Sequence, residues 1–336
     1  MIRRSFLKKL IVIFIILCQK KLIAKENLIK KSINLINKTY IMFDPIFKKY
    51  HISPSHPESP DRIRYIEKGL KAYGLLNKKL NIDHKKKISS WIKKVHTSEH
   101  INSISKSYPL ANKVAQAGVR ACLTAVDSVV NKKSKNIFCA VRPPGHHALN
   151  TGKEEGFCYY NNIAIAAKYA QVKYKLKKIL IIDWDYHHGN ATEAMFYEDP
   201  TILFFSTHDQ FAYPGTGAPS RKGAGKGIGF NINVHLPCGT NDELIIEKFN
   251  SILLPNVEKF KPNMVLISAG FDSRVNDPLG CFNVTDNGFA QLTKIAMNIA
   301  KKYCNNRLVS ILEGGYNVDG NAKAAISHVL ALEGKI

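Results

Sequence analysis

Short apolar runs alternate with amphipathic stretches along most of the chain from about residue 39 onward. Six runs have the length of a β-strand and are almost continuously apolar, which is typical of strands covered on both faces; they are 137–141, 178–183, 201–206, 229–234, 264–269 and 307–312. Helix-like segments separate them, at 112–130, 161–172, 242–259, 285–303 and 319–332. Three of these segments begin near residues that commonly cap helices, Asn161, Asn241 and Thr285. The alternation predicts one α/β domain with a parallel sheet and helices on both faces.

Polar clusters stand where loops leave the ends of the predicted strands, which is where ligands bind in sheets of this kind. RPPGHH (142–147) follows the first run, and GFCYYNN (156–162) comes soon after it. DWDYHHGN (183–190) closes the second run, GFDS (270–273) follows the fifth, and EGGYN (313–317) follows the sixth. The chemistry of the protein is therefore expected at this edge of the sheet.

The cluster at 183–190 has the pattern of a metal site. Asp183, Asp185 and His187 are two residues apart, so in extended chain their side chains point the same way. One imidazole and two carboxylates from separate loops bind Zn²⁺ or Fe²⁺ and leave a position open for water. Asp185, His187 and Asp272 supply such a set. Buried charges at the ends of apolar strands are costly unless a partner or a cation compensates them.

These motifs resemble, in order and spacing, those of the histone deacetylase/acetylpolyamine amidohydrolase superfamily: RPPGHHA, GFCYYNN, IDWDYHHGN, SAGFD and LEGGYN. The resemblance begins near Tyr40, where FDP and HPESPDR are similar to the family's opening, and predicts a catalytic domain over 39–336. It implies an arginase-like fold with a single eight-stranded parallel sheet and helices on both faces. Asn190, together with Glu313, resembles the class II branch and its bacterial relatives.

The resemblance implies that Asp185, His187 and Asp272 hold Zn²⁺, with Fe²⁺ as the alternative. The metal polarises the acyl carbonyl and makes a bound water nucleophilic near neutral pH. A structural monovalent cation, K⁺, is also implied behind the metal, near Asp183, Asp185, His187, Ser206 and Thr207.

His146 and His147 resemble the family's tandem general base and acid. One takes the proton from the attacking water, and protonation of the leaving amine completes amide cleavage. Asp183 matches the carboxylate that orients His146, and Asn190 matches the partner of His147. An amide makes this hydrogen bond without a charge, so we expect His147 to lose its proton more easily than beside a carboxylate.

Four further residues match the family's oxyanion donor and substrate tunnel. Tyr316 occupies the position of the tyrosine whose hydroxyl donates to the developing oxyanion. Phe157 matches one aromatic wall of the tunnel, and Tyr213 stands where a second Phe is usual. Two aromatic faces suit the apolar chain of a lysine. Leu279 replaces the Glu of the polyamine-selective branch, which disfavours a polyamine substrate.

We therefore expect a zinc-dependent deacylase that hydrolyses the acetamide of N-acetyl-lysine in proteins or peptides. One alternative is an amidohydrolase of small acetylated amines such as acetylpolyamines, and another is a catalytically silent module that binds acetyl-lysine. The complete ligand set, both histidines and Tyr316 argue against the silent module.

The charge of the chain adds little to this picture. Lys and Arg number 49 and Asp and Glu 26, for a formal net charge of +23. Residues 1–50 carry +10 of it, while residues 179–336, with all three proposed ligands, sum to −3. There is neither an Arg-rich recognition helix nor a zinc-finger spacing, so no specific nucleic acid partner is expected.

The cysteines are odd in number, and no two are spaced as CxxC; they are Cys18, Cys122, Cys139, Cys158, Cys238, Cys281 and Cys304. We therefore expect no disulfide framework and no cysteine-based zinc site. Nearly all of them are predicted to be buried small apolar residues.

The N-terminus has the layout of a bacterial signal peptide over residues 1–24, with a basic head before the apolar run 10–18. Helix of that length extends about 14 Å, too short for a hydrocarbon core of about 30 Å. RRSFLK (3–8) resembles the twin-arginine export signal. This predicts a basic linker at 25–38, transient contact of the signal with the membrane or a translocase, and a periplasmic location. A cytoplasmic protein with a disordered basic arm is the alternative.

Overall fold

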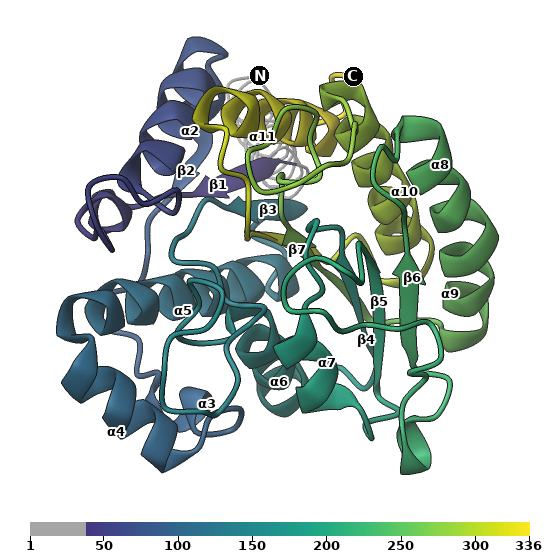
Figure 1. The fold of residues 1–336 in the computed structure, drawn as a ribbon, viewed down its shortest axis with the longest axis horizontal. Helices are drawn as coiled ribbons and strands as arrows, with labels where there is room; N and C mark the ends of the chain where they lie inside the picture. The colour runs from purple at the N-terminus through teal and green to yellow at the C-terminus, as the bar shows by residue number, and fades with distance from the viewer. Residues whose placement is uncertain (1–37) are drawn as a thin grey trace, which may run out of the picture.

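The computed structural model describes residues 38–336, so the signal-like segment 1–24 and nearly all of the linker 25–38 lie outside the described residues. Within 38–336, eight strands form one parallel sheet in the order β2-β1-β3-β8-β7-β4-β5-β6, as Figure 1 shows in part. They are β1 (Thr39–Met42), β2 (Lys79–Leu80), β3 (Asn136–Cys139), β4 (Ile179–Asp183), β5 (Ile202–His208), β6 (Asn231–His235), β7 (Met264–Ala269) and β8 (Leu308–Leu312). The predicted fold class is confirmed.

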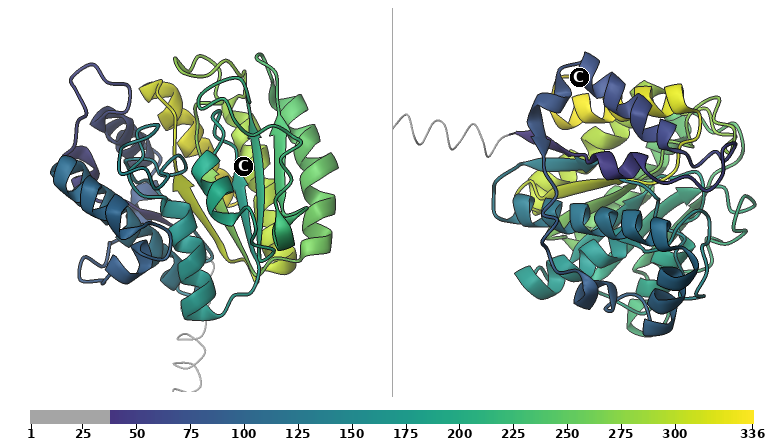
Figure 2. Two further views of the ribbon diagram at one scale, coloured as in Figure 1. Left: turned by 60° about the horizontal axis from the view of Figure 1, so that its bottom comes forward. Right: turned by 90° about the vertical axis from the view of Figure 1, so that its left-hand side faces the viewer.

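Helices cover both faces of the sheet (Figures 1 and 2). One layer contains α2 (Pro60–Ala72), α8 (Asp242–Lys248), α9 (Leu254–Phe260), α10 (Asp286–Tyr303) and α11 (Val318–Leu332). The other contains α3 (Ser89–Ile92), α4 (Ser98–Ser107), α5 (Pro109–Val130), α6 (Asn162–Tyr174) and α7 (Asn190–Phe196). Every residue of β3, β4, β5, β7 and β8 is buried as a result, which explains their continuous apolar sequences.

The predicted elements agree closely with the observed ones. The six predicted strands end within two residues of the observed bounds, and Asn161, Asn241 and Thr285 cap their helices through side-chain acceptors. The predicted helix 242–259 is interrupted by a π-helical turn, η4 (Phe249–Leu253). Pro255, two residues after this turn, has no N–H to continue the regular hydrogen bonding, which accounts for the interruption.

The sequence pattern missed β1 and β2, whose four and two residues are too short to form a recognisable run. Helices α2, α3, α4 and α7 were also not predicted. In the described part of the chain, none of the helices is long and apolar enough to span a bilayer.

The four strands that carry the polar motifs, β3, β8, β7 and β4, are consecutive in the middle of the sheet. The motifs are far apart in sequence, but each lies at the carboxyl end of one of these strands. Because parallel strands end at the same edge, the four loops converge on one place.

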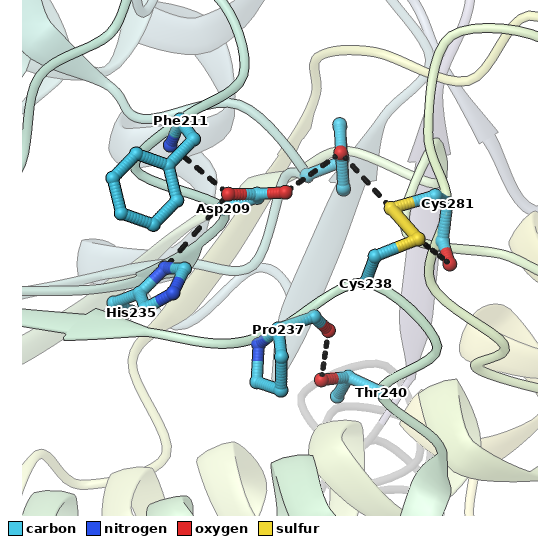
Figure 3. Close-up of a disulfide and its surroundings, with 8 residues drawn as sticks. Asp209, Phe211, His235, Pro237, Cys238, Thr240 and Cys281 are labelled. Atoms are coloured by element: carbon cyan, nitrogen blue, oxygen red, sulfur yellow. Dashed lines mark hydrogen bonds and ion pairs between the residues drawn. A yellow bond between two sulfur atoms is a disulfide. The ribbon is translucent and has the colours of Figure 1, made fainter.

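Two cysteines depart from the expected pattern. Cys238 and Cys281 form a disulfide across 43 residues of sequence, with their Cα atoms 5.2 Å apart (Figure 3). The prediction of a buried apolar role is wrong for this pair, and it holds for Cys122, Cys139, Cys158 and Cys304, which are free and buried. The odd number of cysteines did not reveal this pair, because the pairing depends on two loops that meet in the fold. Gly239 N donates to Cys281 O at 2.8 Å, and Asn283 N donates to Thr240 O at 2.7 Å.

Candidate active site

The proposed metal ligands meet at the ends of β4 and β7. One ligand atom from each of Asp185, His187 and Asp272 can be chosen so that all three lie within 4.8 Å of one another. His187 Nδ1 lies 3.2 Å from Asp185 Oδ1 and 3.0 Å from Asp272 Oδ2. Both carboxylates are fully buried. The structure therefore brings together the three side chains that the sequence singled out.

The electrostatics of this cluster fit a divalent cation. Burial and the charge of Asp185 raise the pKa of Asp272 to about 7. Although burial opposes its charge, hydrogen bonds to Asp185 and Asp272 raise the pKa of His187 to about 10. Two buried carboxylates thus demand positive charge at this point, and a bound cation supplies it without the proton on His187.

Two glycines leave room for the carboxylates. A Cβ atom on Gly270 would lie 2.0 Å from Asp185 Oδ2, and one on Gly314 would lie 2.0 Å from Asp272 Oδ2. Gly314 N also donates to Asp185 Oδ2 at 2.8 Å. The glycines after β7 and β8 are therefore needed for the close approach of these loops to the cluster.

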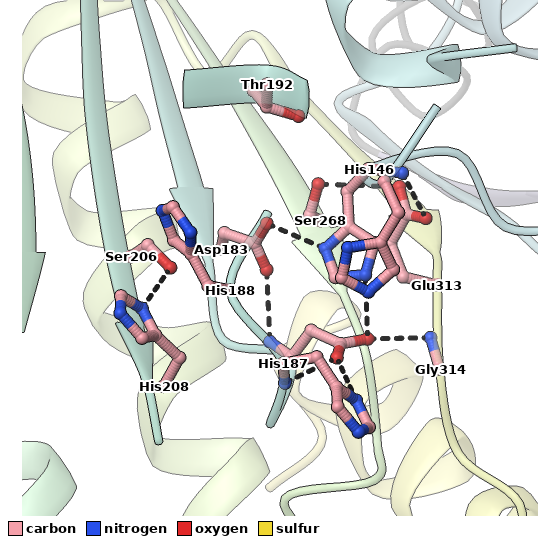
Figure 4. A network of polar contacts seen from close by, with 12 residues as sticks. His146, Asp183, His187, His188, Thr192, Ser206, His208, Ser268, Glu313 and Gly314 are labelled. Carbon is pink, nitrogen blue, oxygen red and sulfur yellow. Dashed lines mark hydrogen bonds and ion pairs between the residues drawn. The ribbon is translucent and has the colours of Figure 1, made fainter. Parts of the chain in front are cut away.

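His146 and His147 lie beside the cluster with ring centroids 4.0 Å apart (Figure 4 shows the surroundings of His146). His146 Nδ1 donates to Asp183 Oδ2 at 3.0 Å, and His147 Nδ1 donates to Asn190 Oδ1 at 2.7 Å. Each histidine thus has the partner that the family resemblance implied. Both imidazoles are buried, and their Nε2 atoms are left free of these two bonds.

The pKa values of the two histidines are shifted in opposite directions. Burial, and after it the positive charge of His146, holds the pKa of His147 well below its usual range. Burial also opposes a charge on His146, but Asp185 and Asp183 outweigh it and raise the pKa of His146 well above the usual range. The two adjacent rings therefore differ strongly in proton affinity, a difference that acid–base chemistry uses.

Tyr316 approaches the same place from the loop after β8. Its side chain is almost fully buried, and burial raises the pKa of its hydroxyl well above the usual value despite the nearby Arg62. The Arg62 guanidinium carbon lies 4.9 Å from the centre of the Tyr316 ring, and Arg62 Nε donates to Gly315 O at 2.6 Å. The hydroxyl consequently stays protonated and available as a donor.

A buried ionic network supports the histidine loop. Arg142 donates to Glu58 Oε1 at 2.8 Å and Glu58 Oε2 at 2.6 Å, and Arg62 reaches the same carboxylate at 3.2 Å. Glu313 Oε2 accepts from Gly145 N at 2.6 Å and from His146 N at 3.2 Å. Arg142 thus supports the histidine loop and is not among the residues that line the cavity beside the histidines.

A cavity of about 460 Å³ leads to this cluster, lined by His147, Gly156, Phe157, Tyr186, His187, Ala212, Tyr213, Leu279 and Tyr316. The three predicted tunnel residues, Phe157, Tyr213 and Leu279, all line this cavity. The Tyr213 ring packs edge-on against His147 with centroids 5.0 Å apart. Tyr213 and Leu279 are partly exposed, which places them toward the mouth of the cavity.

Two of the residues proposed for a monovalent cation, Ser206 and Thr207, lie in the strand next to that of Asp183. Ser206 and Thr207 are fully buried in β5, which pairs with β4 so that Ser206 is level with Asp183. Ser206 Oγ bonds to His208 Nδ1 at 2.8 Å, and Thr207 Oγ1 is buried without a hydrogen-bond partner. His208 and His188 are buried and bond to Gly217 O and Thr216 Oγ1, which fits structural roles for both.

Several residues that shape the site had no predicted role. Tyr186 lines the cavity, and Asp277 accepts hydrogen bonds from Tyr316 N at 2.7 Å and Asn317 N at 3.0 Å. Glu58 and Arg62 belong to the HPESPDR segment at the start of α2, and its similarity to the family's opening was the available signal. Asp277 lies two residues before Leu279 and carried no separate signal.

The fold and this cavity define an arginase-like α/β enzyme with a buried Asp–His–Asp cluster, the donor set of a metal site, beside paired histidines. Comparison with known proteins narrows the class. The model of the histone deacetylase domain matches residues 56–332. A probable deacetylase of Archaeoglobus fulgidus is 36% identical over 297 residues, which cover 84% of this chain and 82% of that protein.

Two further proteins extend the comparison. The chloroplastic histone deacetylase 14 of Arabidopsis thaliana is 42% identical over 220 residues, covering 64% of this chain and 52% of that protein. The crystal structure of an HDA15 HD domain superposes with a TM-score of 0.83 at 33% identity and covers 89% of both chains. The chain belongs to the histone deacetylase family, and it is accordingly a hydrolase.

Proposed function

We propose that this protein is a metal-dependent deacylase that hydrolyses the acetamide of N-acetyl-lysine in proteins or peptides. One observation supports it above all. Side chains that follow three strands face the same cavity: His147 and Phe157 after β3, His187 after β4 and Tyr316 after β8. The inner end of this cavity meets the buried acidic cluster. Water activation, proton transfer and oxyanion stabilisation are then available at one point.

Asp185, His187 and Asp272 would hold the metal, Zn²⁺ in our proposal and Fe²⁺ as the alternative. When bound, such a cation acts as a Lewis acid on the acyl oxygen and lowers the pKa of a coordinated water. The remaining steps depend on side chains of the protein.

His147, the neutral ring, is the group suited to accept the proton of the attacking water. His146, held charged by Asp183 and Asp185, contributes positive charge next to it. The Tyr316 hydroxyl donates to the oxyanion that develops on the acyl oxygen. A proton then passes to the leaving amine, and lysine and acetate are released.

The shape of the cavity favours acetyl-lysine over small acetylated amines. Phe157 and Tyr213 offer aromatic surface to an apolar lysine chain, and Leu279 at the mouth has no charge to attract a distant ammonium group. Small acetylated amines remain the second candidate substrates, and hydrolysis of both classes by the same preparation distinguishes them.

The test begins with metal analysis of protein prepared without chelators, followed by assays with an acetyl-lysine peptide and an N-acetylated polyamine. We expect about one equivalent of Zn²⁺ or Fe²⁺ per chain and a higher kcat/KM for the peptide. Removing the metal abolishes hydrolysis, and adding Zn²⁺ restores it. Asp272→Asn, which keeps the size of the side chain, should lose both metal and activity. Metal-replete protein that cleaves neither substrate would refute the proposal.

We further propose that K⁺ binds near Asp183, Asp185, His187, Ser206 and Thr207. The buried carboxylate of Asp183 and the hydroxyl of Ser206, which is level with it in the adjacent strand, support a cation there. Replacing K⁺ by a bulky organic cation at constant ionic strength should lower Tm. An identical Tm in both salts would count against this site.

Export through the twin-arginine route is a separate proposal, supported by the RRSFLK segment. Cell fractionation of the wild-type chain and of a variant with Arg3→Lys and Arg4→Lys tests it. We expect periplasmic protein only for the wild type, and a cytoplasmic location of both would contradict export.

A further inference from the structure

The disulfide between Cys238 and Cys281 lies next to the mouth of the cavity. Leu279, which lines the cavity, stands two residues before Cys281. The hydroxyl of Tyr186, another lining residue, is 3.3 Å from Cys281 Sγ and donates to Asp209 Oδ2 at 3.1 Å. Figure 3 shows Asp209 in the surroundings of the disulfide. The disulfide therefore borders the entrance that a substrate must pass.

The rim segment, residues 277–281, is held at both ends. At its start, the Asp277 carboxylate accepts hydrogen bonds from Tyr316 N at 2.7 Å and from Leu279 N at 3.0 Å. At its end, Cys281 is bonded to Cys238, and its carbonyl accepts from Gly239 N. The rim segment thus connects the disulfide to the loop that carries Tyr316.

The backbone of the rim segment is closely packed against its neighbours. A Cβ atom on Gly280 would lie 2.1 Å from the carbonyl oxygen of Asp272 and 3.2 Å from Cγ of Tyr186. The backbone between Leu279 and Cys281 is therefore pressed against the cavity wall. A change in how Cys281 is held is transmitted to Leu279 and Tyr186 over a few ångströms.

The two sulfurs are also the accessible ones among the described cysteines. Cys238 is exposed and Cys281 is partly exposed, whereas Cys122, Cys139, Cys158 and Cys304 are buried. Burial also raises the pKa of the Cys304 thiol to about 12, which keeps that residue out of exchange reactions. An external thiol therefore meets the Cys238–Cys281 bond first.

We propose that Cys238 and Cys281 form a thiol–disulfide exchange site whose redox state controls how the mouth of the cavity accepts peptide substrates. The reactants are small or protein dithiols and their disulfides. The effect on substrates rests on the proposed deacylase function, and the exchange itself does not.

The exchange is a two-electron reaction. A thiolate of the dithiol attacks Cys238 Sγ, the Cys238–Cys281 bond breaks, and Cys281 leaves as a thiolate that takes a proton from water. The second thiol of the reagent then attacks the mixed disulfide and releases Cys238. The reagent ends as its own disulfide and the protein as two thiols. An oxidised reagent restores the bond by the reverse steps.

Reduction frees the Cys281 end of the rim segment but leaves Asp277 bonded to the Tyr316 loop. We therefore expect KM for acetyl-lysine peptides, whose flanking residues reach the rim, to rise at least threefold on reduction. The kcat for the same peptides should change less than twofold. A small acetylated amine that ends inside the cavity should keep its KM.

The experiment compares oxidised and dithiol-treated full-length protein, the Cys238→Ser/Cys281→Ser variant, and Cys304→Ser as the matched control that keeps the pair. Alkylation and mass spectrometry should show two additional modified thiols after reduction, at Cys238 and Cys281. Hydrogen exchange of the peptide containing Leu279 should become at least threefold faster. The double variant should have the KM of the reduced protein, and the dithiol should not change it further. Treating this variant with the dithiol also measures any effect of the reagent on the metal.

Two results would overturn the proposal: alkylation of both cysteines before reduction in protein purified from an oxidising compartment, or equal KM and equal exchange rates in the two redox states. Absence of hydrolysis in every form would instead refute the deacylase function. The alkylation and hydrogen-exchange measurements decide the exchange site in that case.

Discussion

His147 donates its Nδ1–H to Asn190 Oδ1 at 2.7 Å, whereas the adjacent His146 donates to a carboxylate. This difference in partner adds to the electrostatics of the pair. The pKa of His147 lies well below the usual range of a histidine, and the pKa of His146 lies well above it. The identity of residue 190 therefore bears directly on the pH dependence of catalysis.

Asn190→Asp should move the acidic limb of the kcat/KM profile upward by about one to two pH units. A carboxylate raises the pKa of His147, so the neutral form that accepts a proton is lost at higher pH. Asn190→Ala, which removes the acceptor without adding charge, should lower activity without this upward shift. A limb that stays in place in Asn190→Asp would exclude His147 as the proton acceptor.

Tyr316→Phe should lower kcat by roughly 10²- to 10³-fold and leave KM for an acetyl-lysine peptide nearly unchanged. The variant removes only the hydroxyl, whose pKa burial keeps well above the working range. Steady-state kinetics measure the effect, and metal content should equal that of the wild type. A kcat within threefold of wild type would show that the oxyanion is stabilised elsewhere.

Asp277→Asn should reduce kcat about tenfold and lower the free energy of unfolding by about 1–3 kcal/mol. The carboxylate accepts from three backbone amides, those of Leu279, Tyr316 and Asn317, and an amide side chain cannot accept from both sides. Asp319→Asn, at an exposed position of α11, is the control and should change neither quantity. Unfolding curves and kinetics together separate loss of fold from misplacement of Tyr316.

Glu58→Gln should destabilise the protein by about 3–5 kcal/mol, because it leaves Arg142 and Arg62 without their shared charge in a fully buried place. Asp61→Asn, which breaks an exposed pair with Arg64, should cost less than about 1 kcal/mol. Denaturant unfolding checks both values. Equal effects of the two substitutions would show that the buried network adds no specific stability.

Acid should destabilise the protein partly through His328. Burial lowers the pKa of His328 to about 3, well below about 6.5 in the unfolded chain. Its contribution is complete above pH 6.5 and is lost as the pH falls toward 3, by roughly 2 kcal/mol at pH 5. His328→Gln should therefore show a shallower fall of unfolding free energy between pH 7 and 5. His51→Gln, at an exposed position, should follow the wild-type slope.

The sequence predicted the residues that carry the chemistry of the site better than the residues that position them. His146, Asp185, His187 and Asp272 lie at the ends of long apolar strands, where an unexplained charge or imidazole is conspicuous. Asp277 and Tyr186 belong to irregular loops, where polar and aromatic residues are common, so nothing distinguished them. The Cys238–Cys281 pair was hidden for the same reason, because only the meeting of two loops brings the sulfurs together.

By itself the sequence determined the class of fold, the strand ends that carry polar motifs, and the identity of the candidate ligands, because these depend on local pattern. Only the tertiary structure decided that β3, β8, β7 and β4 are neighbours in the sheet. Helical crossovers allow strands far apart in the chain to pair, so chain order does not specify sheet order. That order places four loops that are distant in sequence at one edge of the sheet. The rim segment from Asp277 to Cys281 reaches the cavity because of this arrangement.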